Sequence, residues 1–190
     1  MKGMLKGVAA LALASALFTT SAQAQTSVQF GIGGGLTLPL GDFGDAAKTG
    51  YQGALHAEFA PANLPVGFRI EGMYQRLGFS DLFETAFGSG NWQMISGTAN
   101  VVYTFQTSEE STFHPYLIGG AGAYNMKSNF DDFDDDSETK FGINAGAGFN
   151  VAMGSASVFI EGRFHNIFTE DESTNFVPIN VGVRFGGSGM

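Results

Sequence analysis

The C-terminal part of the chain carries a regular alternation of apolar residues with small or polar ones. Residues 176–185 read FVPINVGVRF, and the alternating apolar positions after Phe176 are Val177, Ile179, Val181, Val183 and Phe185. Successive side chains of a β-strand point to opposite faces, so this period of two predicts a strand with one apolar face. Its aromatic end suggests the strand that closes a β-barrel.

Seven earlier segments have a strand-like pattern, and helical periodicity is nearly absent, so we predict an all-β chain. The eight predicted strands are residues 27–38, 51–59, 68–79, 95–105, 115–126, 141–151, 158–165 and 176–185. Glycine breaks the pattern in the first and fifth, so their faces stay unassigned. The longer, mostly acidic connectors are residues 39–50, 80–91, 127–139 and 169–175, and the shorter ones are 60–66, 106–112 and 152–156. Long loops at one rim and tight turns at the other, beside both termini, predict an eight-stranded antiparallel up-and-down barrel.

Most charges of the predicted strands fall on their polar faces. These charged and histidine residues are His56, Glu58, Arg69, Glu71, Glu161, Arg163, His165 and Arg184. Carboxylates and guanidinium groups occur in near-equal numbers, and the set contains no lysine. We therefore predict a charge network that fills a narrow lumen, because about eight strands leave room only for side chains.

Period two alone does not say which face is inside. A soluble, secreted lipocalin-like barrel would turn Leu55, Phe59, Ile70 and Tyr74 inward around an apolar ligand, and this is the alternative. A transmembrane barrel would turn the same residues toward lipid. The polar faces are mostly small residues, which suits a filled lumen, and aromatic residues near strand ends suit interfacial girdles. Both observations favour the transmembrane barrel.

The first residues have the features of a cleaved signal peptide. Lys2 and Lys6 precede an apolar run at residues 8–17, and Ala22-Gln23-Ala24 forms a cleavage site. The run is shorter than the roughly 20 residues that a spanning helix needs. We predict a signal peptide at residues 1–24, a barrel domain at 25–185 and a short tail at 186–190. No cysteine follows the cleavage site, which argues against a lipid-anchored lipoprotein.

Composition excludes several classes of function. The chain has no cysteine, which rules out disulfides and thiolate metal sites. Removal of the first 24 of the 190 residues leaves 166, which is enough for one domain. The same removal takes away Lys2 and Lys6 and changes the formal net charge from −9 to −11. A strongly acidic exported chain would be repelled by phosphates, so we expect no nucleic-acid partner.

The chain resembles the small eight-stranded outer-membrane barrels of the OmpA/OmpX type. The resemblance covers nearly all of the mature chain and rests on GIGGGLTLPLGDF (31–43), RIEG (69–72), HPYLIGGAGAY (114–124) and VPINVGVRF (177–185). It implies a bacterial outer-membrane location with extracellular loops and periplasmic termini. It also implies that the apolar positions of residues 177–185 act as a membrane-insertion signal read by the barrel-assembly machinery. The five-residue tail departs from the family's pattern, in which the aromatic residue is terminal.

Two other motifs have simple interpretations. The glycine run at residues 31–35 lacks the G-x-G-x-x-G spacing of a phosphate loop and no helix pattern follows it, so we interpret it as strand glycine. Clustered carboxylates could hold Ca²⁺ or Mg²⁺, but this acidic loop lacks the turn glycine and terminal glutamate spacing of an EF-hand. A solvated, self-repelling loop is the favoured interpretation. The acidic loop residues are Asp131, Asp132, Asp134, Asp135, Asp136 and Glu138.

The histidines give little support for catalysis. Some outer-membrane barrels are lipid hydrolases with a histidine–serine pair, but no serine lies at short strand spacing from His165. We expect a non-enzymatic barrel without a cofactor that serves membrane integrity, adhesion or surface interaction. Its expected partners are outer-membrane lipid and an unidentified extracellular partner.

Overall fold

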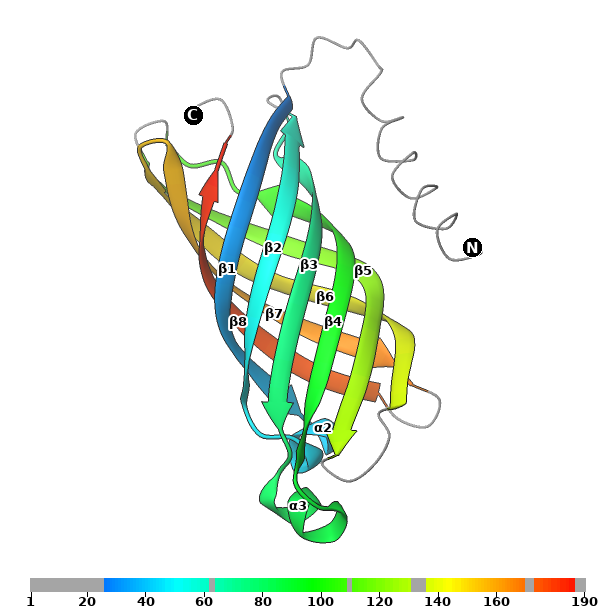
Figure 1. Ribbon diagram of the computed structural model, residues 1–190. Helices are drawn as coiled ribbons and strands as arrows, with labels where there is room; N and C mark the ends of the chain where they lie inside the picture. Colours follow the sequence, from blue (N-terminus) through cyan, green and yellow to red (C-terminus); the bar gives the residue numbers. More distant parts are fainter. Residues whose placement is uncertain (1–25, 62–63, 109–110, 131–135, 170–172, 187–190) are drawn as a thin grey trace, which may run out of the picture.

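Eight antiparallel strands form one closed barrel in the computed structural model, which describes residues 26–61, 64–108, 111–130, 136–169 and 173–186 (Figure 1). Each strand pairs with the next along the chain, and β1 pairs with β8 to close the wall. The strands are β1 (Thr26–Leu40), β2 (Gly50–Pro61), β3 (Val66–Gly78), β4 (Gly90–Thr104), β5 (Phe113–Phe130), β6 (Asp136–Met153), β7 (Ala156–Phe168) and β8 (Ser173–Phe185). The predicted up-and-down barrel is confirmed.

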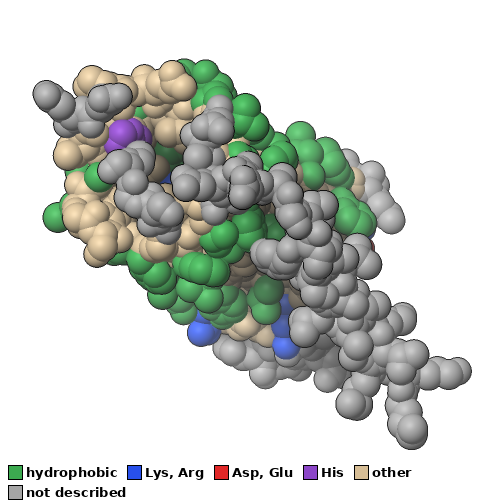
Figure 2. All heavy atoms as spheres, turned by 90° about the horizontal axis from the view of Figure 1, so that it is seen from above, with side chains coloured by type: hydrophobic (Ala, Val, Ile, Leu, Met, Phe, Trp, Pro, Cys, Tyr) green, Lys and Arg blue, Asp and Glu red, His purple; other side chains and the backbone are tan. Residues whose placement is uncertain are grey.

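Burial alternates along the strands with a period of two, and the polar side chains are the buried ones. In β3, Arg69 is 1% exposed and its neighbour Ile70 is 62% exposed. In β2, likewise, the apolar side chain is outside and the charged one inside: Leu55 is 62% exposed and Glu58 is buried. Figure 2 shows hydrophobic side chains gathered around the outside of the wall. A soluble barrel that binds an apolar ligand needs the opposite arrangement, so the lipocalin-like alternative is not supported.

The structure assigns the faces of the two glycine-broken strands. In β1, Phe30, Ile32 and Leu36 point outward, and Thr37 is buried. In β5, Tyr116, Ile118 and Tyr124 are buried, whereas Phe113 and Leu117 are exposed. Glycine and alanine hide this alternation in the sequence because they give little polarity contrast between the two faces.

Several strands are longer than their polarity pattern predicts. β5 and β6 each have 18 residues and stay paired as far as Ser128 and Asp136, inside the predicted acidic loop. The backbone hydrogen bonds of a sheet do not depend on side-chain polarity, so the ladder continues beyond the apolar band.

Two short helices in the long connectors were not predicted. α2 (Asp42–Ala46) lies between β1 and β2, and α3 (Asp81–Phe87) lies between β3 and β4. They have 5 and 7 residues, too few to show helical periodicity in the sequence. The hydroxyl of Ser80 caps α3 by accepting a hydrogen bond from the Phe83 amide. Among the described residues, no helix is long and apolar enough to cross a membrane.

The two rims of the barrel differ. The start of β1, the end of β8 and the ends of β2, β4 and β6 lie at one rim, and α2 and α3 lie at the other (Figure 1). A hydrophobic cluster fills the barrel beneath the helices, with Trp92 and Met126 packed against it. Its buried members are Phe43, Ala47, Leu77, Met94, Tyr124, Ile167 and Phe176.

Candidate functional site

The interior of the barrel contains a charged site. All eight residues of the predicted lumen set are buried, and they come from β2, β3, β7 and β8. The alternation of each strand turns its charges inward, and closure of the barrel brings the four strands around one interior. Charged groups at this depth need partners, because an isolated buried charge is strongly unfavourable.

Arg69 lies at the centre of the first group of ion pairs. Its Nε and Nη2 donate to Glu58 Oε2 at 3.0 and 2.8 Å, and its Nη1 donates to Glu161 Oε2 at 2.6 Å. Glu58 also lies 3.4 Å from Nη1 of Arg184. Arg69 therefore links neighbouring β2 to β7 on the far side of the lumen.

Arg163 continues the network on the other side of Glu161. Its Nε lies 2.9 Å from Glu161 Oε1, its Nη2 pairs with Glu71, and its Nη1 donates to Asn144 Oδ1 at 3.4 Å. Glu71 in turn lies 3.8 Å from Nδ1 of His56. Arg69, Arg163 and Arg184 thus alternate with Glu58, Glu161 and Glu71, which makes the network neutral when both histidines are neutral.

Tyr116 is a member of the network that sequence reasoning missed. Its hydroxyl donates to Glu161 Oε2 at 2.8 Å and accepts from Arg184 Nη2 at 3.1 Å. The Arg184 guanidinium carbon lies 4.9 Å from the Tyr116 ring centroid and 5.0 Å from that of Phe159, within the range of cation–π contacts. The sequence did contain an indication of this role. Tyr116 and Tyr124 are an even number of residues apart in a strand of small residues, so both side chains must lie on the same face.

His165 lies apart from the ion pairs, beneath the apolar cluster. Its Nδ1 is 2.9 Å from the Tyr124 hydroxyl, and its ring stacks on Phe176 with centroids 4.9 Å apart. The charged network and the apolar cluster are therefore contiguous, and together they fill the lumen toward the α2/α3 rim.

Small inward residues make room for the long charged ones. A Cβ atom added to Gly31 would lie 2.2 Å from the His56 ring, and one added to Gly146 would lie 2.7 Å from Cγ of Arg163. These glycines are needed because a narrow barrel cannot hold a large side chain at every inward position. This close approach explains part of the high glycine content, 28 residues of 190.

The network leaves some buried polar atoms without a partner among the described residues. They include Nε2 of His56, Nε2 of His165 and Nε of Arg184. Buried groups of this kind commonly bind ordered water. We therefore expect hydration of the lumen at these positions.

Lys140 corrects the expectation of a lysine-free lumen. It pairs in register with Tyr124, whose side chain points inward, and its own side chain is 17% exposed. Its ammonium lies 2.5 Å from Glu138 Oε1. The sequence pattern missed it because the strand continues beyond the apolar band.

The remaining predicted site residues lie outside the lumen or outside the described residues. Ile179, Val181, Val183 and Phe185 are exposed on the outer wall of β8, and Val177 is half-buried. Asp131, Asp132, Asp134 and Asp135 lie outside the described residues, and so do the predicted signal peptide and most of the tail. Among the residues that are described, no group of three or more histidine, aspartate or glutamate side chains could hold a metal ion.

Comparison with known proteins identifies the family. The family model described as outer membrane protein beta-barrel domain matches residues 10–185. Comparison with curated proteins gives no match.

Similar solved structures include Neisserial surface protein A, with a TM-score of 0.62, 18% identity, and coverage of 84% of this chain and 96% of that one. A major outer membrane protein from Thermus thermophilus has a TM-score of 0.61, 14% identity, and coverage of 85% and 99%. Ail, the attachment invasion locus protein of Yersinia pestis, in complex with the heparin analogue sucrose octasulfate, has a TM-score of 0.50, 19% identity, and coverage of 84% and 97%. These likenesses concern the fold, and the match over residues 10–185 shows that the chain belongs to the outer membrane protein beta-barrel domain family.

Proposed function

We propose that this outer-membrane barrel is a non-enzymatic membrane anchor with a plugged lumen, which presents the α2/α3 rim and the acidic loops to the outside. Its role would be in membrane integrity, adhesion or surface interaction. The observation that carries the proposal is the ion-pair network across the lumen, with the apolar cluster beneath the helices.

The network is better suited to closing the barrel than to conducting ions. Arg69 and Arg163 both contact Glu161, and each also pairs with a carboxylate on β2 or β3. Opening a pore would separate buried opposite charges, and a charge left buried without its partner costs about 3–5 kcal/mol. Phe176 and Leu77, which are fully buried beneath α2 and α3, obstruct the same path.

The arrangement of the loops supports an orientation with the helices outside. The β6–β7 connection is a tight turn at Gly154–Ser155, on the same rim as the start of β1 and the end of β8 (Figure 1). The helices occupy the opposite rim. Outer-membrane barrels place short turns and termini in the periplasm and longer loops outside the cell.

The charge of the helical rim indicates what kind of surface it would contact. Asp42 and Asp45 lie in α2, and Asp81 and Glu84 lie in α3. The similar Ail structure contains a heparin analogue, which is a polyanion, whereas this rim would repel a polyanion. We therefore favour a partner with a basic or neutral surface.

Contacts of the histidines support a role without catalysis. In the described part of the chain no histidine hydrogen-bonds a serine, and His165 contacts the Tyr124 hydroxyl instead. His114 does lie 3.0 Å from the Thr107 hydroxyl, in a half-buried position at the rim opposite α2 and α3. An assay for lipid hydrolysis with wild type and His114→Ala would contradict the proposal if the wild type alone released fatty acid.

Conductance tests the plugged lumen directly. We expect purified wild-type protein in planar bilayers to show no steady large conductance, because the lumen is filled. A double variant, Arg69→Ala with Arg163→Ala, serves as the comparison, since it removes the two cations that bridge the lumen. Persistent open-channel currents from folded wild-type protein would contradict a plugged barrel.

Orientation needs a separate experiment. A protease site inserted between Gly88 and Ser89, after α3, should be cut on intact cells, and one inserted at Gly154–Ser155 should be cut only after lysis. The second insertion is the matched control for folding. The reverse result would overturn the proposed orientation without affecting the plugged lumen.

A further inference from the structure

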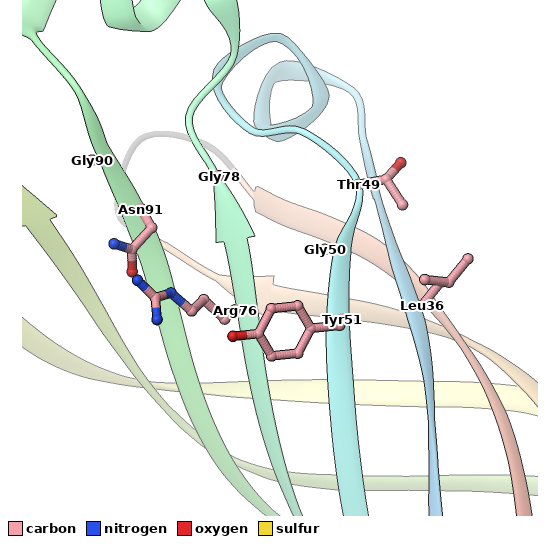
Figure 3. Close-up of a pocket in the computed structure, with 8 residues that line it drawn as sticks. All are labelled: Leu36, Thr49, Gly50, Tyr51, Arg76, Gly78, Gly90 and Asn91. Carbon is pink, nitrogen blue, oxygen red and sulfur yellow. The ribbon is translucent and has the colours of Figure 1, made fainter.

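The outer wall has a hollow at the α2/α3 end of β1 to β4, with a volume of about 470 Å³. Its lining includes Leu36, Tyr51, Arg76, Gly78 and Asn91 (Figure 3). This volume falls within the range of small-molecule sites, about 300–1,000 Å³. Since it opens on the lipid-facing side of the wall, its natural occupant is a molecule of the membrane.

The lining changes from apolar to polar along one row of paired residues. Leu36 pairs with Tyr51, Tyr51 pairs with Arg76, and Arg76 pairs with Gln93, each on the neighbouring strand. Directly paired residues point to the same face of a sheet. The row therefore places an apolar side chain, an aromatic ring and a guanidinium side by side on the outside.

Arg76 differs from the other arginines of the chain. Arg69, Arg163 and Arg184 are buried in the lumen network, whereas Arg76 is exposed and has no hydrogen bond or ion pair within the described part of the chain. An unpaired guanidinium beside an apolar wall can bind an external anion, and its planar fork matches the two oxygens of a phosphate.

The depth of Arg76 matches the headgroup region of a bilayer. The outward residues of β3 run Phe68, Ile70, Gly72 and Tyr74 before Arg76, so the charge follows the last aromatic residue of the apolar band. Tyrosine is enriched at the membrane–water interface, and basic side chains beside it reach the headgroups.

Asn91 lies beside Arg76, with its amide oxygen on the side of the guanidinium (Figure 3). Its Oδ1 accepts hydrogen bonds from Gln93 Nε2 at 3.3 Å and from Asn129 Nδ2 at 3.4 Å. These contacts orient the amide, and Nδ2 has no acceptor within the described residues. Figure 3 shows the Asn91 side chain next to the Arg76 guanidinium, with the Tyr51 ring over β3.

Charges of both signs lie near the hollow. Lys127 follows Gln93 in the same row of paired residues and adds a second positive charge to this part of the wall. The α3 acids Asp81 and Glu84 lie 2.7 and 3.8 Å from the Lys48 ammonium, which offsets part of their charge.

We propose that this hollow binds an anionic lipid of the leaflet around the α2/α3 rim, with its phosphate on Arg76 and its acyl chain along Tyr51 and Leu36. The site is independent of the orientation of the barrel and of its role at the surface. It gives the rim a specific lipid contact in addition to general solvation by the bilayer.

Native mass spectrometry from a neutral detergent tests the site, with phosphatidylglycerol and phosphatidylcholine of the same chains as probes. We expect wild-type protein to retain one phosphatidylglycerol in preference to phosphatidylcholine. Arg76→Gln should weaken phosphatidylglycerol binding about tenfold or more, because a charge-assisted bidentate contact is lost. Gly78→Leu should also weaken it, because this glycine has open space around its Cβ position and a leucine there would fill the hollow.

The double variant Lys48→Gln with Asp81→Asn is the matched control, since it removes an opposite pair of charges from the same rim outside the hollow and should leave the preference unchanged. Heat-modifiable migration on a gel verifies that each variant is folded. Equal preference in wild type and Arg76→Gln would overturn the proposal. So would displacement of the lipid by inorganic phosphate at equal concentration, which would assign the site to the free ion.

Discussion

At the scale of single residues, the interior is organised around a few long charged side chains and the small residues that face them. Arg69 and Arg163 are each 1% exposed and contact carboxylates from more than one strand. A buried guanidinium has a large desolvation cost, which two carboxylates and additional hydrogen bonds can offset. The stability of the barrel therefore depends on individual side chains in the lumen.

Replacement of Arg163 by alanine should strongly destabilise the barrel. It would leave Glu71 without its arginine partner in the interior, and removal of one member of a buried pair costs about 3–5 kcal/mol. Urea-induced unfolding in lipid vesicles measures the change in the free energy of unfolding. The double variant Arg163→Met with Glu71→Gln is the control and should lose less stability than the single variant. If Arg163→Ala unfolded at the same urea concentration as the wild type, the Arg163–Glu71 pair would contribute little to stability.

A valine at Gly31 should destabilise the barrel by overpacking. Its Cβ would lie 2.2 Å from the His56 ring, and forced repacking of a filled interior costs about 1–3 kcal/mol. Gly72→Val is the matched control, because Gly72 faces outward in β3 and has no atom within 4 Å of its Cβ position. Thermal unfolding followed by gel migration compares the two variants. Similar losses at both positions would attribute the effect to the strand and not to the lumen.

At the scale of elements, the strands and the two short helices are stabilised differently. Each strand pairs with a neighbour on both sides, whereas α2 and α3 are too short to be stable in isolation. The helices depend on the Ser80 cap, on the aromatic rings of Phe79, Phe83 and Trp92, and on Lys48. Local changes at these residues should therefore affect the rim and not the wall.

The docking of α3 should weaken at high pH. The hydrogen bond to Asp81 raises the pKa of Lys48 above its ordinary value of 10.5. A raised pKa means that the ion pair contributes fully below the ordinary value and is lost as the pH rises through the raised one. Fluorescence of Trp92, the only tryptophan, should show an alkaline transition in wild type. Lys48→Met controls for tyrosine ionisation, and the same transition in this variant would exclude Lys48 as its cause.

The outward face of β8 should influence delivery to the outer membrane. If Phe185 is part of the insertion signal, Phe185→Gln should reduce the amount of folded protein in the outer membrane several-fold. Phe141→Gln is the matched control, because Phe141 is an exposed phenylalanine on the outer wall of β6. Arg184 is not a suitable control, since it is buried in the network. Quantitative blots of membrane fractions compare the variants, and equal amounts would argue against a targeting role.

At the scale of the whole molecule, the barrel is inverted relative to a soluble protein. Apolar side chains cover the outside and charged ones fill the inside, which is stable only when the surrounding solvent is lipid. Closure also removes the free edges that an open sheet would expose in a membrane. Four acidic residues of the α2/α3 rim, Asp42, Asp45, Asp81 and Glu84, lie beyond this apolar wall.

The acidic loop should remain insensitive to calcium. Its carboxylates lack the spacing of a calcium-binding loop, so we expect no ordering by millimolar Ca²⁺. Hydrogen exchange of residues 127–140 with and without Ca²⁺ measures this. The comparison is a variant with Asp134→Asn, Asp135→Asn and Asp136→Asn. Calcium-dependent protection that this variant lacks would contradict the expectation and identify a cation site.

The amino-acid sequence alone determined the strands, the faces of most of them and the identity of the charged lumen residues. The face on which a strand side chain lies depends on whether its position is odd or even along the strand (its parity), which is a local property. His56, Arg69 and Arg163 could therefore be assigned to the polar face without knowledge of the fold. The same argument failed in β1 and β5, where glycine and alanine remove the contrast between the faces. It also failed for α2 and α3, which are too short to show a period.

Only the tertiary structure decided which of these residues meet. Arg69 and Glu161, and likewise Arg163 and Glu71, are 92 positions apart in the sequence, and both pairs form across the closed lumen. The contacts of Tyr116 with Glu161 and Arg184 depend on the same closure. So does the position of Arg76, which the ladders bring beside Tyr51 on one strand and Gln93 on the other. Parity determines whether a side chain faces the lumen or the lipid, but its partners depend on register and barrel closure, and these are properties of all eight strands together.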